Sequence, residues 1–416
     1  MKHWGKILLC GALLLGSAPA AVPGTASAAG EVSIILDGYP LPFPVEPLVK
    51  NGTTMVPFRA ISEALGIKVQ WNQSAKRITA SRVDKAVVKN VVLTLGSKTA
   101  LVNGGSAKLA VAPQTIRGTT MIPLSFFSQQ FGAKVSWNQS TKTVSITSPK
   151  TEMYTLGFYA MSSYSEYALL PDFDAMAFGW SRLDKNGELT TTGADHYWPK
   201  ADGDITPEYI VQNADAGGTT PYLMVYSGDD GLEVTKNLED KALQERTIAN
   251  IIELAVQKGF KGIVLDLEGL GMTGDKAKAA ADYNAFVKNL SGKARAQGLK
   301  LSIAVHPINS SYTGYDYKTL ASLADDLIVM AYAYEDEQRP EPTAKVDEAI
   351  RLALKQTTKD KIVLGVSLYS ENESSVNTKI GLAKRYGLKG IAVWRLGLIG
   401  QKAWNEMNKS VELSKS

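Results

Sequence analysis

The chain has 416 residues, 44% of them hydrophobic and 21% charged, and a formal net charge of +4. This length predicts two or three globular domains, and so small a net charge gives no reason to expect a nucleic-acid partner. The charge is uneven: residues 31–150 carry 14 Lys and Arg against 5 Asp and Glu, whereas residues 151–416 carry 29 against 36. The basic first region is a candidate to contact an anionic cell-wall polymer, and a solvated Lys-rich surface explains its composition equally well.

The N-terminus reads as an export signal. Two lysines precede the apolar run 7–16, and small residues follow up to an A-x-A cleavage motif that ends at Ala28. The run is too short to cross a bilayer comfortably, and no later stretch is long and apolar enough for a membrane span. We therefore expect residues 1–28 to be a signal peptide and the protein to be secreted, either extracellular or associated with the cell wall. Cys10, the one cysteine, would leave with the signal, so no disulfide is expected.

An internal repeat follows. The stretch "NGTTMVPFRAISEALGIKVQWNQSAKRITA" begins at Asn51, and "RGTTMIPLSFFSQQFGAKVSWNQSTKTVSI" begins 66 residues later at Arg117. Each copy predicts a strand, a short helix that Pro opens and Gly ends, and two strands joined by a Trp-Asn-Gln-Ser turn. The region therefore predicts a small duplicated α+β module. Trp71 and Trp137 are either sugar-stacking residues or aromatic residues buried in their hairpins, and the pattern favours burial.

This region, residues 31–148, resembles the copper amine oxidase N-terminal domain, and the doubled G-T-T-M-[VI]-P motif carries the resemblance. The region contains no His and no Cys, so it lacks the usual ligands of copper. The resemblance therefore implies a stalk that acts as a spacer or as a contact to the wall, with no cofactor and no chemistry of its own.

After a short linker the pattern changes to apolar strands that alternate with amphipathic helices. Long helical patterns cover residues 238–258 and 276–297. About eight βα units in about 260 residues predict a TIM (β/α)8 barrel over residues 153–410, and near-continuous apolar strands fit a parallel sheet that is buried on both faces. The expected strands are 154–160, 174–180, 220–227, 262–268, 301–307, 326–334, 361–369 and 390–397.

The fourth of these strands, within "KGIVLDLEG", carries two carboxylates, Asp266 and Glu268. Side chains two apart lie on one face of a strand, and both residues stand at its C-terminal end, where TIM-barrel active sites are built. Two ionisable groups at this rim favour chemistry. The structural alternative is an ion pair with a Lys or Arg that points into the barrel.

Other strands bring polar and aromatic side chains to the same rim. Carboxylates, a tyrosine hydroxyl and a tryptophan face are typical of a sugar site, although any one of these aromatic residues by itself would read as barrel core. His306 ends the fifth strand and either touches substrate or is a satisfied rim histidine; Tyr197 and Trp198 are candidates to wall the cleft from a long loop. The candidates for substrate binding are Tyr159, Met330, Trp394, Arg395 and His306, and Tyr332 joins Asp266 and Glu268 as a catalytic candidate.

From about residue 154 to 408 the chain resembles glycoside hydrolase family 18. The family's fourth-strand motif D-x-x-D-x-D-x-E becomes K-G-I-V-L-D-L-E here, so Lys261 and Val264 replace the first two aspartates while Asp266 and Glu268 remain. This shortened D-x-E form and the ending "GIAVWRLG" are similar to the branch that contains spore-cortex and cell-wall glucosaminidases.

The resemblance implies that the substrate's own 2-acetamido oxygen is the nucleophile, an exception to the two-carboxylate scheme. Glu268 would be the general acid and then the base, Asp266 would hold the acetamide N–H, Tyr332 would bond the acetamide oxygen, and Trp394 would underlie the sugar. The substrate would then be a β-linked N-acetylglucosamine polymer, either peptidoglycan or chitin. No metal is expected.

Two departures from the family pattern leave an alternative open. Ala333 stands where the sixth-strand motif has an acid, with Glu335 two residues later, and Val264 removes a carboxylate partner of Asp266. The sequence favours a secreted glycosidase, and the alternative is an inactive carbohydrate-binding barrel held at the cell wall. A structural coat protein would neither bind nor cleave sugar.

Overall fold

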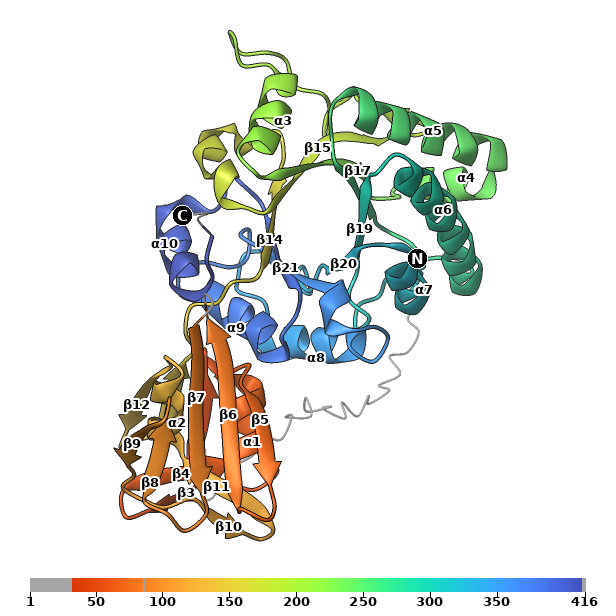
Figure 1. Cartoon of the computed structure of the whole chain (residues 1–416). Helices are drawn as coiled ribbons and strands as arrows, with labels where there is room; N and C mark the ends of the chain where they lie inside the picture. Colours follow the sequence, from red (N-terminus) through yellow and green to blue (C-terminus); the bar gives the residue numbers. More distant parts are fainter. Residues whose placement is uncertain (1–31, 85–86, 414–416) are drawn as a thin grey trace, which may run out of the picture.

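The computed structural model describes residues 32–84 and 87–413, which form a small β-rich domain beside a ring of strands and helices (Figure 1). The predicted signal peptide lies outside the described residues. Within those residues, none of the helices has the length and apolar character that a membrane crossing requires.

The first domain is built from three small sheets and two short helices. Its sheet orders are β12-β13-β1-β2, β10-β11-β4-β3 and β5-β6-β7-β8-β9. The elements are β1 Ser33–Leu36, β2 Tyr39–Pro40, β3 Leu48–Lys50, β4 Thr53–Pro57, α1 Phe58–Ala64, β5 Lys68–Asn72, β6 Arg77–Asp84, β7 Val87–Thr94, β8 Thr99–Val102, β9 Gly105–Lys108, β10 Gln114–Ile116, β11 Thr119–Pro123, α2 Leu124–Gln130, β12 Lys134–Asn138 and β13 Thr143–Thr147.

The sequence repeat is visible in the pairing of β4 with β11. These strands are equivalent in the two copies and run antiparallel, with Val56 opposite Ile122, its own counterpart 66 residues on. Helices α1 and α2 follow them, and each helix ends where the sequence places a glycine, Gly66 or Gly132, with positive φ. The two copies are therefore related by an approximate twofold axis at Val56 and Ile122.

The second domain is a closed barrel of eight parallel strands, as the sequence predicts. The ring runs β14-β22-β21-β20-β19-β18-β17-β15, and β15 closes it by pairing with β14. The strands are β14 Tyr154–Tyr159, β15 Ala175–Leu183, β17 Thr220–Ser227, β18 Gly262–Leu267, β19 Lys300–Val305, β20 Asp326–Val329, β21 Ile362–Ser367 and β22 Gly390–Trp394, with the short β16 Leu189–Thr190 antiparallel to β15. The TIM-barrel prediction is confirmed.

Helices surround the barrel (Figure 1). Asp240 ends α4 and caps α5 by accepting hydrogen bonds from the N–H groups of Ala242 and Leu243, so the helical pattern 238–258 is two helices and not one. The helical elements are η1 Ser163–Asp172, α3 Pro207–Ala216, α4 Glu233–Glu239, α5 Lys241–Gln257, α6 Lys276–Ala296, α7 Tyr317–Leu323, α8 Thr343–Ala353, η2 Lys359–Lys361, α9 Val376–Tyr386 and α10 Gly400–Ser410.

The barrel core has two shells because side chains alternate along each strand. On β18, Ile263, Leu265 and Leu267 face the helices, whereas Val264 lies in the barrel interior. The interior cluster consists of Leu156, Phe158, Ala175, Ala177, Tyr222, Met224, Val264, Ala304, Ile328, Met330, Val363 and Ala392. The barrel interior is therefore packed with side chains, and a substrate can be bound only at the ends of the strands.

The first domain docks against α9 of the barrel. Arg385 donates hydrogen bonds to the carbonyls of Leu36, Tyr39 and Pro40 at 3.0–3.2 Å. On the same helix, a Cβ added to Gly381 would lie 2.4 Å from the Cβ of Asp37, so only glycine allows this approach.

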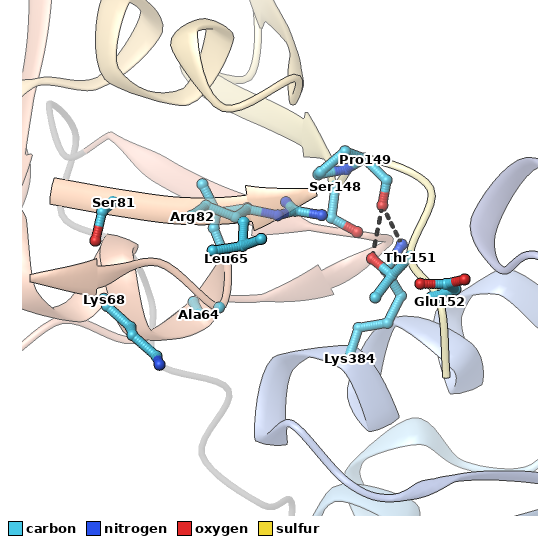
Figure 2. A pocket seen from close by; sticks show the side chains of 12 residues that line it. Ala64, Leu65, Lys68, Ser81, Arg82, Ser148, Pro149, Thr151, Glu152 and Lys384 are labelled. Carbon is cyan, nitrogen blue, oxygen red and sulfur yellow. Dashed lines mark hydrogen bonds between the residues drawn. The ribbon is translucent and has the colours of Figure 1, made fainter. Parts of the chain in front are cut away.

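Near the linker, the domains enclose a cavity of about 390 Å³, where Lys384 donates to the carbonyl of Pro149 at 2.9 Å (Figure 2). The close approach at Gly381 and the bonds of Arg385 and Lys384 make the junction a specific contact.

Arg385→Ala tests this junction. Three carbonyls lose a charged donor, so we expect the free energy of unfolding to fall by about 1–3 kcal/mol. We also expect a larger radius of gyration in solution scattering, because the domains separate. Lys409→Ala on α10 is the control, since Lys409 is exposed and pairs with Glu406 of its own helix. Unchanged stability and radius in Arg385→Ala would contradict the proposed role of Arg385.

Candidate active site

Asp266 of β18 and Glu268, which directly follows that strand, lie together at the C-terminal mouth of the barrel. Asp266 points inward two residues beyond Val264, is 3% exposed, and stands in register with Tyr226 of β17. Glu268 follows the strand, and its backbone N–H donates to the carbonyl of Ser227 at 2.7 Å. The Glu268 side chain is 28% exposed. One carboxyl is thus sealed in the barrel while its neighbour reaches solvent.

Burial makes Asp266 a proton holder. Desolvation raises the pKa of Asp266 well above its usual value, and the charge of Glu268 and a hydrogen bond to Glu268 raise it further. Among the described residues, Asp266 Oδ1 has no hydrogen-bond partner. The structural alternative for this pair, an ion pair with an inward Lys or Arg, is therefore not found in the described part of the chain. The pair instead holds a proton next to a carboxylate that solvent can reach.

His306 flanks Glu268 from the end of β19. Its Nε2 lies 3.3 Å from Glu268 Oε2, a close contact without hydrogen-bond geometry. The imidazole stacks on Tyr312 with ring centroids 3.8 Å apart and an angle of 14° between the planes. The stacking fixes the ring beside the carboxylate, so His306 lies within the site.

Tyr332 approaches the carboxylates from the segment after β20. Burial raises the pKa of its hydroxyl, and the charges of Asp266 and Glu268 raise it further. Its ring passes over Gly365 of β21, where an added Cβ would lie 2.8 Å from Tyr332 Cε1. The hydroxyl therefore stays a neutral donor near the carboxylate pair.

Two residues that sequence reasoning missed also approach the pair. Tyr226 stands opposite Asp266 on β17, and burial together with the charges of Glu268 and Asp266 raises the pKa of its hydroxyl. His196 stacks on Tyr226 with ring centroids 4.2 Å apart, and burial lowers the pKa of its imidazole. The alternation along β17 could have revealed Tyr226, whereas His196 comes from an irregular loop that no periodicity describes.

Three of the remaining candidates lie around the mouth. Met330 is buried in the interior cluster, and Trp394 packs edge-on against Phe158 with ring centroids 5.2 Å apart while it stays partly exposed. Arg395 is held by neighbours, since it donates to Ser162 and to the hydroxyl of Tyr369. Trp394 therefore has a free surface over the interior, whereas Met330 forms the floor and Arg395 belongs to the rim.

The structure corrects the placement of Tyr159. Phe158 faces the barrel interior, so Tyr159 faces the opposite way, into the outer shell. Its ring packs on Phe178 and Trp180, with ring centroids 5.3 and 5.7 Å apart. Trp198 likewise packs on Trp180 in the outer shell and does not wall the carboxylates. Because side chains alternate along a strand, Phe158 and Tyr159 must face opposite sides. Position at the C-terminal end of the strand was therefore not enough to predict that Tyr159 faces the site.

The segment after β20 is not a strand to residue 334, because β20 ends at Val329. Ala333 adopts a positive φ of 55°, and Glu335 points away to Arg339 and Lys345. Glu337 comes closer: its pKa is raised by burial and by Glu341, and it shares a hydrogen bond with Ser367 at the end of β21. The charge of Glu268 acts on it as well. Glu337, which the sequence did not single out, is thus a carboxylate of this loop that interacts electrostatically with the site.

A buried ionic network holds this loop. Glu341 accepts hydrogen bonds from the backbone N–H groups of Ala333 and Tyr334 at 2.9 and 3.4 Å. The N–H of Glu341 donates to Glu371 at 3.0 Å, and Glu371 pairs with Lys379 at 3.2 Å. These three charged side chains are at most 5% exposed. They fix the backbone that directly follows Tyr332.

Comparison with protein families agrees with this geometry. Residues 227–372 match the model of Glycosyl hydrolases family 18, and residues 35–146 match that of the Copper amine oxidase N-terminal domain. The barrel has the fold of family 18 glycosyl hydrolases. Both resemblances that the sequence predicts are confirmed, and the matched part of the barrel contains Asp266 of β18 and the Glu268 that follows it.

Curated relatives lie in the genus Bacillus. The chain is 22% identical over 278 residues to the cortical fragment-lytic enzyme of Bacillus anthracis, a match that covers 50% of this chain and 63% of the relative. It is 23% identical over 235 residues to the enzyme of the same name in Bacillus subtilis strain 168, with 40% of this chain and 53% of that protein covered. The chain thus spans less than two thirds of these relatives.

Solved structures share the barrel fold. The Bacillus cereus spore cortex-lytic enzyme SleL superposes with a TM-score of 0.52 at 18% identity, covering 64% of this chain and 76% of that one. A chitinase from Chromobacterium violaceum gives 0.51 at 19% identity, covering 62% and 98%. These likenesses establish the fold, and the residues at the strand ends must carry the function.

The buried carboxyl predicts a pH effect on stability. The folded-state pKa of Asp266 lies above the unfolded value, which is about 4. The folded protein therefore holds a proton that the unfolded chain has lost, and its stability falls as the pH rises from about 4 through the folded-state pKa. Asp266→Asn removes this loss, so we expect it to raise the free energy of unfolding at pH 7 by about 1–2 kcal/mol.

Asp326→Asn is the matched control, measured by thermal and urea unfolding across pH. Asp326 is 1% exposed on β20, which β19 separates from β18 in the barrel, but it is paired with Lys389 at 2.5 Å. Its replacement should lower stability at pH 7 by about 1–3 kcal/mol. If Asp266→Asn is less stable than wild type at pH 7, the buried carboxyl does not lower the free energy of unfolding in the predicted way.

Proposed function

We propose that the protein is a secreted glycoside hydrolase that cleaves β-linked N-acetylglucosamine polymers. The observation that carries the proposal is the buried Asp266 carboxyl, whose pKa is raised by desolvation, next to the accessible Glu268, at the mouth of a barrel with the family 18 fold. The neighbouring Tyr332 hydroxyl and the partly exposed Trp394 supply a donor and a ring surface for a sugar. Together these groups fit acid catalysis on a glycosidic bond.

In the proposed first step, Glu268 delivers the proton that the pair holds to the glycosidic oxygen. The bond from the anomeric carbon to that oxygen breaks, while the acetamido oxygen of the same sugar forms a bond to the anomeric carbon. Asp266 is then ionised and accepts the acetamide N–H, which stabilises the positive charge of the cyclic intermediate. Tyr332 donates to the acetamido oxygen and aligns it for attack.

In the second step, water attacks the anomeric carbon and gives its proton to Glu268. The bond to the acetamido oxygen breaks, so the configuration at the anomeric carbon is retained after two displacements. His306, whose Nε2 lies 3.3 Å from Glu268 Oε2, is positioned to contact this carboxylate in both steps. Trp394 supports the sugar from below, and Met330 and Arg395 shape the floor and the rim. These steps use the chain's own side chains, the substrate and one water molecule.

Within this class we favour peptidoglycan over chitin. The curated relatives are named as cortical fragment-lytic enzymes, and a solved neighbour is named as a spore cortex-lytic enzyme. The first domain supports a location at the wall, since residues 31–150 have an excess of nine basic residues. An anionic wall polymer is the partner that we propose for that surface, in an extracellular, cell-wall or spore-related setting.

The proposed division of the chain follows from these roles. Residues 1–28 would direct export and be removed, residues 31–148 would form the stalk, and residues 153–410 would form the catalytic barrel. The linker between the last two is short, and the junction at α9 holds the stalk beside the barrel. The stalk therefore sets where the barrel stands relative to the wall.

The second candidate function is an inactive carbohydrate-binding barrel. Two observations favour it: Ala333 replaces the acid of the sixth-strand motif, and Val264 leaves Asp266 without a second carboxylate beneath it. Both functions require a sugar at the mouth, and they differ in turnover. Glu337, the loop carboxylate that approaches the site, is the group that could stand in for the missing acid.

Release of reducing ends from purified peptidoglycan and from chitin oligomers tests the two candidates. Wild type should turn over at least one of them, and Glu268→Gln should lose about 10²–10⁴-fold in kcat, the usual contribution of a general acid. Glu239→Gln is the control, since Glu239 is an exposed carboxylate on α4 that contacts Lys278. Binding without turnover by wild type would favour the inactive barrel, and full activity of Glu268→Gln would exclude Glu268 as the acid.

A further inference from the structure

The first domain contains a cavity of about 500 Å³ on the face where α1 meets β5 and β11. A volume in this range is typical of sites for small ligands. Trp71 of β5 and Phe58 of α1 supply aromatic walls, and Thr119 and Thr120 of β11 supply hydroxyl groups. The cavity lies between the two copies of the repeat.

The polar and apolar groups of this cavity are arranged for a mixed ligand. The indole N–H of Trp71 already donates to Gln73 Oε1 at 2.6 Å, so the ring's remaining contribution is its apolar surface. Arg59 and Glu63 stand one turn apart on the exposed side of α1 and bring a donor set and an acceptor of opposite charge. A flat apolar wall with donors and acceptors around it and no net charge suits a neutral, hydroxyl-rich molecule.

The repeat shows why this cavity belongs to the first copy. With a shift of 66 residues, Trp71 corresponds to Trp137, and Ala60 corresponds to Phe126. The small Ala60 leaves space beside Trp71, whereas in the second copy a phenyl ring stands at the same position and packs against the core. Trp137 is 44% exposed, which corrects the expectation that both tryptophans are buried in their hairpins.

The polar pair is also specific to the first copy. Arg59 corresponds to Ser125 and Glu63 to Gln129, so both charges are absent from the second copy. Both copies have the tryptophan, whereas the space beside it and the two charged side chains are present in the first copy and absent from the second. A purely structural tryptophan would not need these differences.

We propose that this cavity binds pyranose residues of the same N-acetylated glycan, and thus tethers the polymer beside the barrel. The inference rests on the proposed function for its choice of glycan. The Trp71 ring stacks on the sugar face, and Arg59 and Glu63 bond hydroxyl or acetamido groups. Because the junction at α9 fixes the domain to the barrel, a tethered strand stays near the mouth and its effective concentration there rises.

The test measures binding of the full chain to purified peptidoglycan and to chitin particles by co-sedimentation. Glu268→Gln is the parent, which prevents degradation during the assay. Trp71→Ala removes the ring, and Ala60→Phe fills the cavity with the side chain of the second copy while it keeps Trp71. Trp137→Ala is the matched control. We expect Trp71→Ala and Ala60→Phe each to raise the apparent Kd roughly tenfold, and Trp137→Ala to change it less than twofold.

Turnover of soluble oligomers, measured with Glu268 intact, separates this inference from the proposed function. Trp71→Ala and Ala60→Phe should leave the rate on short oligomers unchanged and lower it on the insoluble polymer. If wild type binds polymer through Trp71 but never cleaves, the proposed activity fails and the tether stands.

Equal binding by parent, Trp71→Ala and Ala60→Phe would overturn the tether, and so would an equal loss in Trp137→Ala or a parent that binds neither polymer. The alternative ligand for the cavity is a peptide, and we test it by measuring binding of a proline-rich decapeptide with fluorescence polarisation. Binding of this peptide in a Trp71-dependent manner, without glycan binding, would also overturn the inference. Melting curves of both variants must match the parent, and Ala60→Phe, at a partly exposed position, covers the case in which Trp71→Ala does not fold.

Discussion

The Asp266 carboxyl is buried inside a closed barrel next to Glu268, and this burial is energetically costly. A negative charge on Asp266 would be desolvated and would repel Glu268. Both effects raise the pKa of Asp266 and favour a proton on the pair. That proton is what a glycosidic oxygen needs when its bond breaks. The closed ring of parallel strands makes this possible, because alternation sends Val264 and Asp266 inward while Ile263, Leu265 and Leu267 secure the strand against the helices.

Three different sets of contacts position the side chains around Asp266 and Glu268. Tyr312 stacks on His306, Gly365 makes room for the ring of Tyr332, and the buried network of Glu341, Glu371 and Lys379 holds the backbone after Tyr332. The network matters because this loop leaves the strand early and turns at Ala333 through a positive φ. A buried ion network is weak evidence for stability, and its role here is better understood as fixing one loop conformation.

The sequence predicted the fold well and the site in part. The repeat and the alternation of apolar strands with helices predicted the duplicated domain and the eight-stranded barrel, because both depend on periodicity. The register of β18 placed Asp266 and Glu268 correctly at the mouth. Tyr159 was misplaced because its position at a strand end was used as the criterion, although the alternation of side chains decides which way it faces. Trp137 was expected to be buried because it lies in a hairpin, whereas its side chain is exposed. His196 and Glu337 reach the site from irregular loops, whose paths are set by tertiary contacts that no local pattern encodes.

In the proposed mechanism the N-acetyl group of the substrate performs the nucleophilic step, while Asp266 stabilises the positive charge of the intermediate and Glu268 transfers the proton. Initial rates on one soluble β-linked oligomer in its fully N-acetylated form and in its de-N-acetylated form, compared at equal saturation, test this mechanism. We expect turnover of the acetylated oligomer and a rate at background for the other, because the attacking oxygen is missing. Comparable rates on the two oligomers would exclude the acetamido oxygen as the nucleophile and would require a protein carboxylate in that role.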